Sequence, residues 1–447
     1  MTVRTPATSR RAFLKGGAVL GAMLGGGVVP GFIRRALAAI EDDMGDTLGR
    51  SPDGVPAGAR RKVLAFLFLR GALDGLEAVA PYGESRLAEL RPDLALPAPG
   101  GERKSDTGPG ALLDLGASGF GLHPSLEPLL PLWREGTLAV VHAVGLSDAT
   151  RSHFDAQDFL ELGTPGLKST RDGWMARAVA QAAGGRSRLD AIAVAPRVPR
   201  SFRGDPSALA FSSVDQLRIR PVAGMPGGPR GRALARQTFQ ALYENAADPL
   251  VAASAKEAFA AADFLEHKLA ELGHGGGEAG YPDSPVGKSL RLLAALIRSD
   301  VGLRIAFAEV GGWDTHAQQQ GTLSRHLADL GKALAAFRAD LGNSIEEVTL
   351  VAATEFGRTV RQNGSAGTDH GHGSVAFVVG GRVAGGKVHG RWPGLDDDQL
   401  FEGRDLAVTT DLRSVLAAAA AVQLGATDVS RLFPGYTGIV LPGLVGV

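Results

Sequence analysis

The chain has 447 residues, of which 44% are hydrophobic and 62 are glycine, and it contains no cysteine. This length and composition indicate a globular protein with a large core, either one α/β domain or a domain with an insertion. The missing cysteines exclude disulfides, thiolate metal sites, cysteine nucleophiles and a cysteine-linked lipid anchor. Net charge is zero, but residues 1–38 hold six basic and no acidic residues, which leaves 41 basic and 47 acidic ones. A mildly acidic remainder argues against nucleic acid as a partner.

Residues 1–38 have the three parts of a twin-arginine export signal. A twin-arginine motif contains Arg10 and Arg11, a Gly/Ala/Val run covers residues 16–33, and residues 36–38 form a small-x-small cleavage pattern. A permanent membrane anchor is the alternative, but the run is rich in glycine and interrupted by a proline. We therefore predict export in the folded state by the twin-arginine translocase. The mature protein is expected in the periplasm or outside the cell, without a permanent membrane span.

The next residues, 39–60, are rich in proline and glycine and are expected to form a linker. Residues 61–447 then read as one domain in which apolar strands alternate with helices. The strands are expected at residues 63–69, 137–144, 190–198, 301–309, 348–353 and 375–379. This alternation predicts an α/β fold with a mostly parallel central sheet. A segment at about 200–285 is predicted to be a helical insertion.

Four of these strands end in polar residues. In chain order, the polar ends hold Asp74, then Ser152 and His153, then Asp314 and His316, then Glu355, Asp369, His370 and His372. Strand ends at one edge of an open α/β sheet lie close together, so these side chains are expected to converge. Carboxylates and imidazoles are ligands of divalent metals, and a serine at a helix start is close to free N–H groups. The pattern predicts metal-assisted transfer to a serine nucleophile.

Four ordered motifs resemble those of the DUF1501 family. They are Arg-Gly-Ala-x-Asp-Gly-Leu at 70–76, Arg-Ser-His-Phe-Asp-Ala-Gln at 151–157, Gly-Gly-Trp-Asp-Thr-His at 311–316, and Thr-Glu-Phe-Gly-Arg-Thr at 354–359 with Asp-His-Gly-His-Gly at 369–373. The family resembles a branch of the alkaline phosphatase and sulfatase superfamily, whose members hydrolyse phosphate or sulfate esters at a divalent-metal site. The resemblance implies an alkaline phosphatase-like fold with three layers, α/β/α.

The resemblance also implies roles for single positions. Asp74 matches the metal aspartate after the first strand, and Ser152 matches the nucleophile at a helix start. Asp314 and His316 match an aspartate and histidine pair of metal ligands. The final metal histidine of the superfamily is matched by His370 or His372.

The turn at 354–357 departs from the superfamily pattern, which usually carries Asp-His there. Glu355 replaces the aspartate, and Phe356 stands where the histidine would be, although phenylalanine has no donor atom. Asp369 or His370 is the expected replacement ligand if two metals are kept. We predict a single tightly held ion, and zinc, calcium and manganese are all compatible with the residues.

Several of these residues have a simpler structural interpretation. Asp74 has the position of a turn or capping residue, and Ser152 has the position of a helix N-cap. His153 is the next candidate nucleophile, or a hydrogen-bonding partner of a neighbouring loop. Arg358 is expected either to bind an anionic substrate as part of the catalytic set or to pair with a carboxylate.

The leading hypothesis is an exported metal-dependent hydrolase or transferase that acts on phosphate or sulfate esters through Ser152. Its substrate would be a small-molecule or glycan ester. A catalytically silent cell-envelope protein that keeps the fold for binding is the alternative from another class. A third possibility is a metal enzyme with different chemistry.

Overall fold

The computed structural model describes residues 61–102, 109–116, 118–182, 189–217, 221, 224–244, 259–260, 262–269 and 279–446. The export signal predicted at 1–38 and the linker predicted at 39–60 lie outside these residues. Among the described helices, none is long and apolar enough to cross a membrane.

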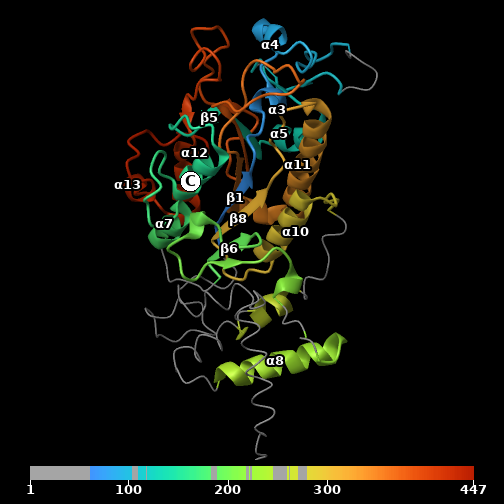
Figure 1. The fold of residues 1–447 in the computed structure, drawn as a ribbon, viewed down its shortest axis with the longest axis vertical. Helices are drawn as coiled ribbons and strands as arrows, with labels where there is room; N and C mark the ends of the chain where they lie inside the picture. Colours follow the sequence, from blue (N-terminus) through green and yellow to red (C-terminus); the bar gives the residue numbers. More distant parts are fainter. Residues whose placement is uncertain are drawn as a thin grey trace, which may run out of the picture. The chain divides into compact units, whose positions relative to one another are not determined.

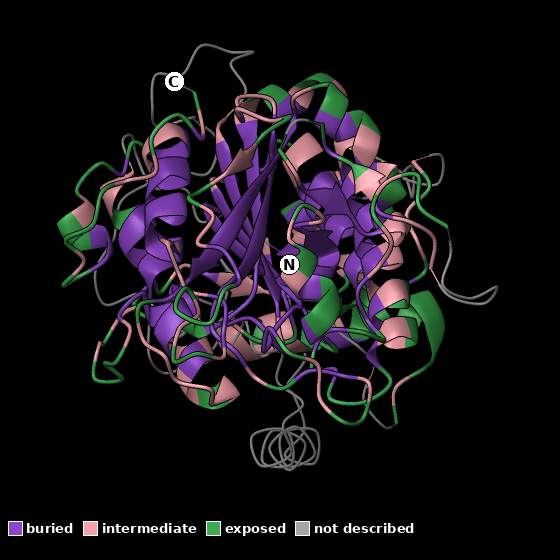
Figure 2. Ribbon diagram, turned by 90° about the horizontal axis from the view of Figure 1, so that it is seen from above, coloured by how far each residue is buried: buried purple, intermediate pink, exposed green. Residues whose placement is uncertain are grey.

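A mixed sheet forms the centre of the fold, with helices on both sides (Figures 1 and 2). Its strand order is β11 (Val388–His389), β5 (Leu138–Gly145), β10 (Ser374–Gly380), β9 (Val348–Ala353), β1 (Val63–Leu69), β8 (Ile305–Val310), β6 (Ala191–Val194) and β7 (Leu209–Ala210). A further strand, β12 (Thr410–Asp411), pairs with β5. Most pairs are parallel, and β10 is antiparallel to both of its neighbours, β5 and β9. The predicted α/β class with a mostly parallel sheet is confirmed.

The central strands are apolar along their whole length because helices cover both faces. β1 has the sequence VLAFLFL and is buried at every position. On one side of the sheet, α12 (Leu412–Leu424) packs on β1 and β9, beside α7 (Trp174–Gln181), which also contacts α13 (Val429–Leu432). On the other side, α10 (Pro285–Arg298) packs on β8 and along α11 (Gln319–Leu341), which also contacts β10.

Shorter elements complete this part of the chain. The helices are α3 (Gly75–Ala78), α4 (Ser85–Leu90), η1 (Pro124–Leu129), α5 (Leu130–Arg134), α6 (His153–Leu162), η2 (Arg200–Phe202) and η4 (Gly342–Glu347). A small antiparallel sheet joins β2 (Val79–Ala80), β4 (Gly121–Leu122) and β3 (Leu113–Asp114) in that order. α6 begins at the Ser152 cap and ends at Gly163, whose φ of 68° is left-handed, so both of its ends follow from local sequence.

The described residues divide into two compact units, one within 46–213 and 267–447 and the other within 214–266. The first unit holds the whole central sheet and every site residue considered below. In the second unit, the described residues form η3 (Val214–Gln216) and α8 (Gly228–Glu244), and Arg236 pairs with Asp263. The helical insertion predicted at about 200–285 includes residues 214–266 of this unit.

Three neighbouring strands end at the same level, and this positions the site. Leu69 at the end of β1 lies beside Val310 at the end of β8, and Phe68 lies beside Ala353 at the end of β9. The loops that follow these three parallel strands therefore leave the sheet at one edge, as ligand-binding loops of open α/β sheets do.

Candidate metal centre

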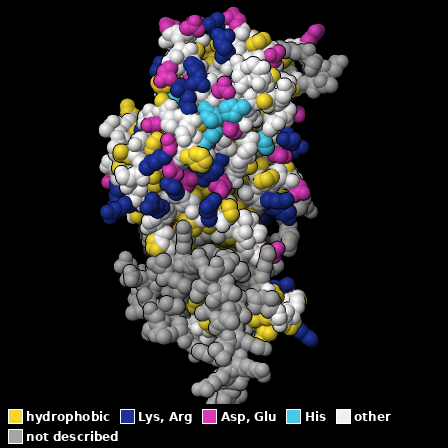
Figure 3. Space-filling view, in the orientation of Figure 1, with side chains coloured by type: hydrophobic (Ala, Val, Ile, Leu, Met, Phe, Trp, Pro, Cys, Tyr) yellow, Lys and Arg dark blue, Asp and Glu magenta, His cyan; other side chains and the backbone are white. Residues whose placement is uncertain are grey.

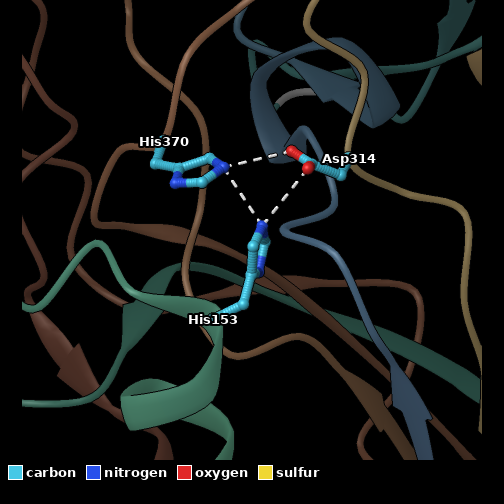
Figure 4. Close-up of side chains that lie close together, drawn as sticks. All are labelled: His153, Asp314 and His370. Carbon is cyan, nitrogen blue, oxygen red and sulfur yellow. Dashed lines mark hydrogen bonds and ion pairs between the residues drawn. The ribbon is translucent and has the colours of Figure 1, made fainter.

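Four side chains meet at this edge, and we call them the histidine cluster: His153, Asp314, His316 and His370. His153 is the first residue of α6, Asp314 and His316 follow β8, and His370 lies in the loop between β9 and β10. Figure 4 shows His153, Asp314 and His370 directed toward one another. Three chain segments that are remote in sequence thus supply one group of nitrogen and oxygen donors.

The ε-nitrogens and the Asp314 carboxylate lie within contact distance. His370 Nε2 is 3.1 Å from His153 Nε2 and 3.0 Å from His316 Nε2. Asp314 Oδ1 is 3.1 Å from His370 Nε2 and 2.9 Å from His316 Nε2. The other Asp314 oxygen, Oδ2, is 3.5 Å from His153 Nε2.

Each δ-nitrogen of the cluster faces an oxygen on the opposite side of its ring. The partners are Glu355 Oε1 for His153 at 2.8 Å, Asp369 Oδ1 for His316 at 3.0 Å, and the Arg151 carbonyl for His370 at 2.8 Å. Carboxylate and carbonyl oxygens only accept, so each Nδ1 carries the proton and donates. In the neutral rings the lone pairs are therefore on the three Nε2 atoms, and that of His370 faces the other two.

This donor set fits a divalent cation. Two neutral imidazoles cannot form a hydrogen bond through two unprotonated Nε2 atoms, so contacts of 3.0 and 3.1 Å call for a positive charge between them. Ligands about 2.0–2.1 Å from a tetrahedral zinc ion lie about 3.3 Å apart. His153, Asp314 and His370 offer ligand atoms that all lie within 4.8 Å of one another. Histidines whose second nitrogen donates to an oxygen are also the usual form of metal-binding histidine.

The environment sets the protonation state that a metal needs at two of these residues, Asp314 and His370. Burial lowers the pKa of His370, which favours the neutral ring. Burial acts to raise the pKa of Asp314, but the hydrogen bond and charge of Arg358 outweigh it and lower the pKa. The hydrogen bond with Glu355 raises the pKa of His153, with burial opposing it. Asp314 is therefore ionised and His370 neutral near neutral pH.

Glu355, which was expected among the metal ligands, lies behind His153 with a fully buried side chain. Its Oε1 accepts from Gly71 N, Gln157 Nε2 and His153 Nδ1, each within 2.9 Å. Its Oε2 accepts from Thr354 Oγ1 at 2.8 Å and more distantly from the Gly71 and Ala72 N–H groups. Both oxygens are thus fully engaged by donors, and the carboxylate orients His153 without facing the cluster's centre.

Gly71 makes that arrangement possible. Its φ of 116° is accessible to glycine and rarely to other residues, and a side chain there would lie 2.8 Å from the Asp314 nitrogen. The turn after β1 can therefore approach the turn after β8 while its N–H donates to Glu355.

Asp74, also expected as a ligand, lies in a buried ion pair. Its side chain and that of Arg91 are each 1% exposed, and Oδ2 accepts from Arg91 Nη1 at 2.8 Å. Oδ2 also accepts from Gln319 Nε2 at 2.6 Å, and Oδ1 caps α3 by accepting from Glu77 N. The structure does not bring Asp74 into contact with the histidine cluster; it occupies the capping position that was its simpler interpretation.

Besides His153, Ser152 and Arg358 were expected to act on substrate, and their surroundings differ. Ser152 is the N-cap of α6, directly before His153, and its Oγ accepts from Asp155 N at 3.4 Å. Arg358 is 1% exposed and its Nη1 donates to Asp314 Oδ1 at 2.6 Å. Its Nε and Nη2 donate to the hydroxyl and the carbonyl of Thr368, respectively. Arg358 therefore pairs with a carboxylate, the second of the two roles expected for it.

The last two predicted residues flank His370. Asp369 holds His316 Nδ1 and also accepts from Asn363 Nδ2 at 3.2 Å, so it orients a cluster histidine. His372 is 7% exposed, its ring packs 4.7 Å from the ring of Phe401, and burial lowers its pKa. Of the two alternatives for the final histidine, the cluster contains His370.

Three residues that support the cluster or the neighbouring Asp74 ion pair were not singled out from the sequence. Gln157 lies four residues after His153 on α6, a spacing that places both on one helix face, so it was detectable. Arg151 contributes its backbone carbonyl, for which side-chain patterns carry no signal. Gln319 donates to Asp74 and accepts from Thr368, which requires knowledge of the tertiary fold.

A comparison of the sequence with known protein families gives a match. The sequence profile of a family described as "protein of unknown function (DUF1501)" matches residues 139–433, a span that contains the whole histidine cluster. No curated protein and no solved structure matches the chain.

Proposed function

The chain belongs to the DUF1501 family, and from this premise we propose that it is a metal-dependent hydrolase or transferase acting on phosphate or sulfate esters. The observation that carries the proposal is the convergence of three imidazole Nε2 atoms on the Asp314 carboxylate, with an acceptor oxygen behind every ring. An alkaline phosphatase-like arrangement of three layers, implied by the sequence resemblance, is part of the same proposal.

His153, Asp314, His316 and His370 would hold the ion. Three imidazoles with one carboxylate favour zinc over calcium, which prefers oxygen ligands, and over manganese. When bound, a divalent cation supplies positive charge that polarises the ester and lowers the pKa of a nearby hydroxyl. The cluster's surroundings serve this role by keeping Asp314 ionised and the rings fixed in one tautomer.

Ser152 is the proposed nucleophile. It is adjacent to His153 in sequence, and it begins α6, so the free N–H groups and the positive end of the helix dipole favour negative charge near its Oγ. In the proposed reaction the Ser152 oxygen bonds to phosphorus or sulfur, the bond to the ester oxygen breaks, and the leaving alcohol takes up the serine proton. Water then cleaves the seryl ester and restores the hydroxyl.

Exchange of Ser152 for alanine tests this function with zinc-loaded protein and aryl esters of phosphate and sulfate. Ser284 provides a matched control because it caps α10 in the same way, accepting from Gly287 N at 3.3 Å. Each substitution is expected to cost about 1 kcal/mol of stability through the lost cap. Only Ser152→Ala is expected to lower kcat, by roughly a hundredfold or more.

Other outcomes would favour the competing functions. Equal activity of Ser152→Ala and wild type would assign the attack to water, with Ser152 as a cap only. Metal-loaded protein that turns over no ester would favour the silent envelope-binding protein. The site of action is proposed to be the periplasm or the exterior, on the basis of the twin-arginine pattern in residues 1–38.

A further inference from the structure

The charges around the histidine cluster restrict the class of ester that it takes. Three carboxylates contact its histidines, from Asp314, Glu355 and Asp369, and one guanidinium, that of Arg358, contacts Asp314. With a divalent cation and neutral imidazoles, these charges cancel. An anion that enters therefore meets the pull of the cation but no surplus of positive charge from the protein.

Arg358 in particular is closed to a substrate. All three of its guanidinium nitrogens donate within the protein, to Asp314 and twice to Thr368, and its side chain is fully buried. A bidentate arginine–oxyanion contact, the usual way in which arginine holds a phosphate dianion, would require these bonds to break.

The other arginines at this edge are also matched by carboxylates. Arg151 contacts Asp405 at 2.6 Å and Glu402 at 2.7 Å. Arg404 donates to the His370 carbonyl at 2.8 Å and lies 3.7 Å from Asp405. Figure 3 shows basic and acidic side chains interspersed around the exposed histidines.

Arg70, which donates to Gln157, is the last arginine near the cluster to consider. It pairs with Glu161 and Glu309 at 2.7 Å each. Among the described residues, every arginine joined to the cluster or to its immediate partners is thus neutralised by at least one carboxylate or held by backbone and side-chain acceptors.

We propose that this site takes esters carrying one negative charge, sulfate monoesters or phosphate diesters, and discriminates against doubly charged phosphate monoesters. The inference rests on the proposed hydrolase function of the same site. No arginine described at this edge is free to hold a second charge on the ester, and Asp314 and Asp369 would repel it. Discrimination between ligands by unmatched charge is a general route to specificity.

Three esters with the same leaving group separate the possibilities: 4-nitrophenyl sulfate, bis(4-nitrophenyl) phosphate and 4-nitrophenyl phosphate. At about pH 8, where the phosphate monoester is a dianion, its kcat/KM with zinc-loaded protein is expected to be roughly tenfold or more below that of the better singly charged ester. The sulfate and diester arms show which singly charged ester is preferred. A higher kcat/KM for the monoester than for both would overturn the inference and leave the hydrolase function intact.

The charge of the substrate can be changed without changing the protein. A phosphate monoester gains a proton near pH 6 and becomes singly charged, whereas a diester keeps its single charge. The ratio of monoester to diester kcat/KM is therefore expected to rise as pH falls through 6, while effects on the protein cancel in the ratio. A ratio that is flat or falls would contradict the charge argument.

If no ester is turned over, the hydrolase proposal itself fails. A binding measurement still tests whether the site prefers singly charged anions. Calorimetry compares benzenesulfonate, which has one charge, with phenylphosphonate, which has two at about pH 8. Tighter binding of benzenesulfonate supports the inference. Tighter binding of phenylphosphonate, or no binding of either anion to zinc-loaded protein, overturns it.

Glu402→Gln tests the same charge balance from the protein side. It removes one of two carboxylates from Arg151, whose backbone carbonyl holds His370, and is expected to raise monoester kcat/KM relative to sulfate several-fold. Asp397→Asn is the matched control, since it removes a carboxylate from the exposed pair with Arg86 on α4. Equal ratios in both variants and wild type would contradict the inference.

Discussion

His153 and Glu355 are joined by a 2.8 Å contact between Nδ1 and Oε1 that links the start of α6 to the end of β9 across 202 positions of sequence. The carboxylate is fully buried and receives two backbone N–H groups, so it cannot turn away. His153 consequently has one tautomer and one ring orientation, and its Nε2 points to His370. Glu355 thus orients His153, one of the proposed metal ligands.

Glu355→Gln is expected to weaken zinc binding by about 10- to 100-fold, because an amide no longer fixes the His153 tautomer or supplies its charge. Asp369→Asn is expected to weaken it less, because Asp369 is half exposed and water can replace it. Zinc competition titration measures both affinities in folded protein. Glu347→Gln, at the opposite end of β9 and paired with Arg382, is the control that should bind zinc normally. Wild-type affinity in Glu355→Gln would contradict the role assigned to this carboxylate.

Asp74→Asn is expected to lower the free energy of unfolding by about 3 kcal/mol while leaving zinc affinity nearly unchanged. The substitution leaves Arg91 buried without its full counter-charge, which is costly. Chemical unfolding and zinc titration give the two quantities, and Asp397→Asn in its exposed pair should cost less than about 1 kcal/mol. Lost zinc affinity with intact stability would make Asp74 a metal ligand after all.

The limits of sequence-based prediction are visible at this same residue. Asp74 was correctly expected near a sheet edge, since a buried strand precedes it, but its partner Arg91 follows in a Pro- and Gly-rich stretch without any periodic signal. The convergence of Asp314, His316 and His370 was predictable, because parallel strands end together. The position of Glu355 behind His153 was not predictable, because the groups that donate to its carboxylate include backbone N–H groups of the turn after β1.

The strand pattern had similar limits. The apolar runs of β1, β8, β9 and β10 predict strands, and the strands are there. After the connection at residues 354–373, which holds His370, β10 runs antiparallel to β9, and apolar runs carry no direction.

Glu77 predicts a pH dependence of stability. Burial, reinforced by the charge of Asp74, raises the pKa of Glu77 to about 8 from the ordinary value of 4.5. Above pH 4.5 the unfolded chain loses this proton while the folded protein keeps it, so stability falls as pH rises and levels off above about pH 8. The slope from this group is at most about 1.4 kcal/mol per pH unit.

Glu77→Gln removes the titratable carboxyl group. The variant should therefore become more stable relative to wild type as pH rises from 5 to 8. Urea unfolding of both proteins without added metal at several pH values gives the difference, in which the contributions of other groups cancel. A difference that is independent of pH would show that Glu77 titrates alike in the folded and unfolded states.

Replacement of Arg10 and Arg11 by lysine is expected to trap the precursor in the cytoplasm, because the twin-arginine motif is the feature that the translocase reads. Cell fractionation followed by immunoblotting detects the uncleaved form. Replacement of Arg34 and Arg35 by lysine is the matched control, since it conserves charge outside the motif. Normal processing of the motif variant would remove the basis for folded export.

The central claim is that His153, Asp314, His316 and His370 hold a single divalent ion, and elemental analysis after zinc loading and dialysis tests it most directly. Wild type should retain one equivalent, and so should His389→Ala, which removes a histidine in β11 whose Nε2 contacts the Ala384 carbonyl. His370→Ala, which removes the nitrogen shared by the most cluster contacts, should retain almost none. Two tightly held equivalents in wild type, or none after reloading, would contradict the account.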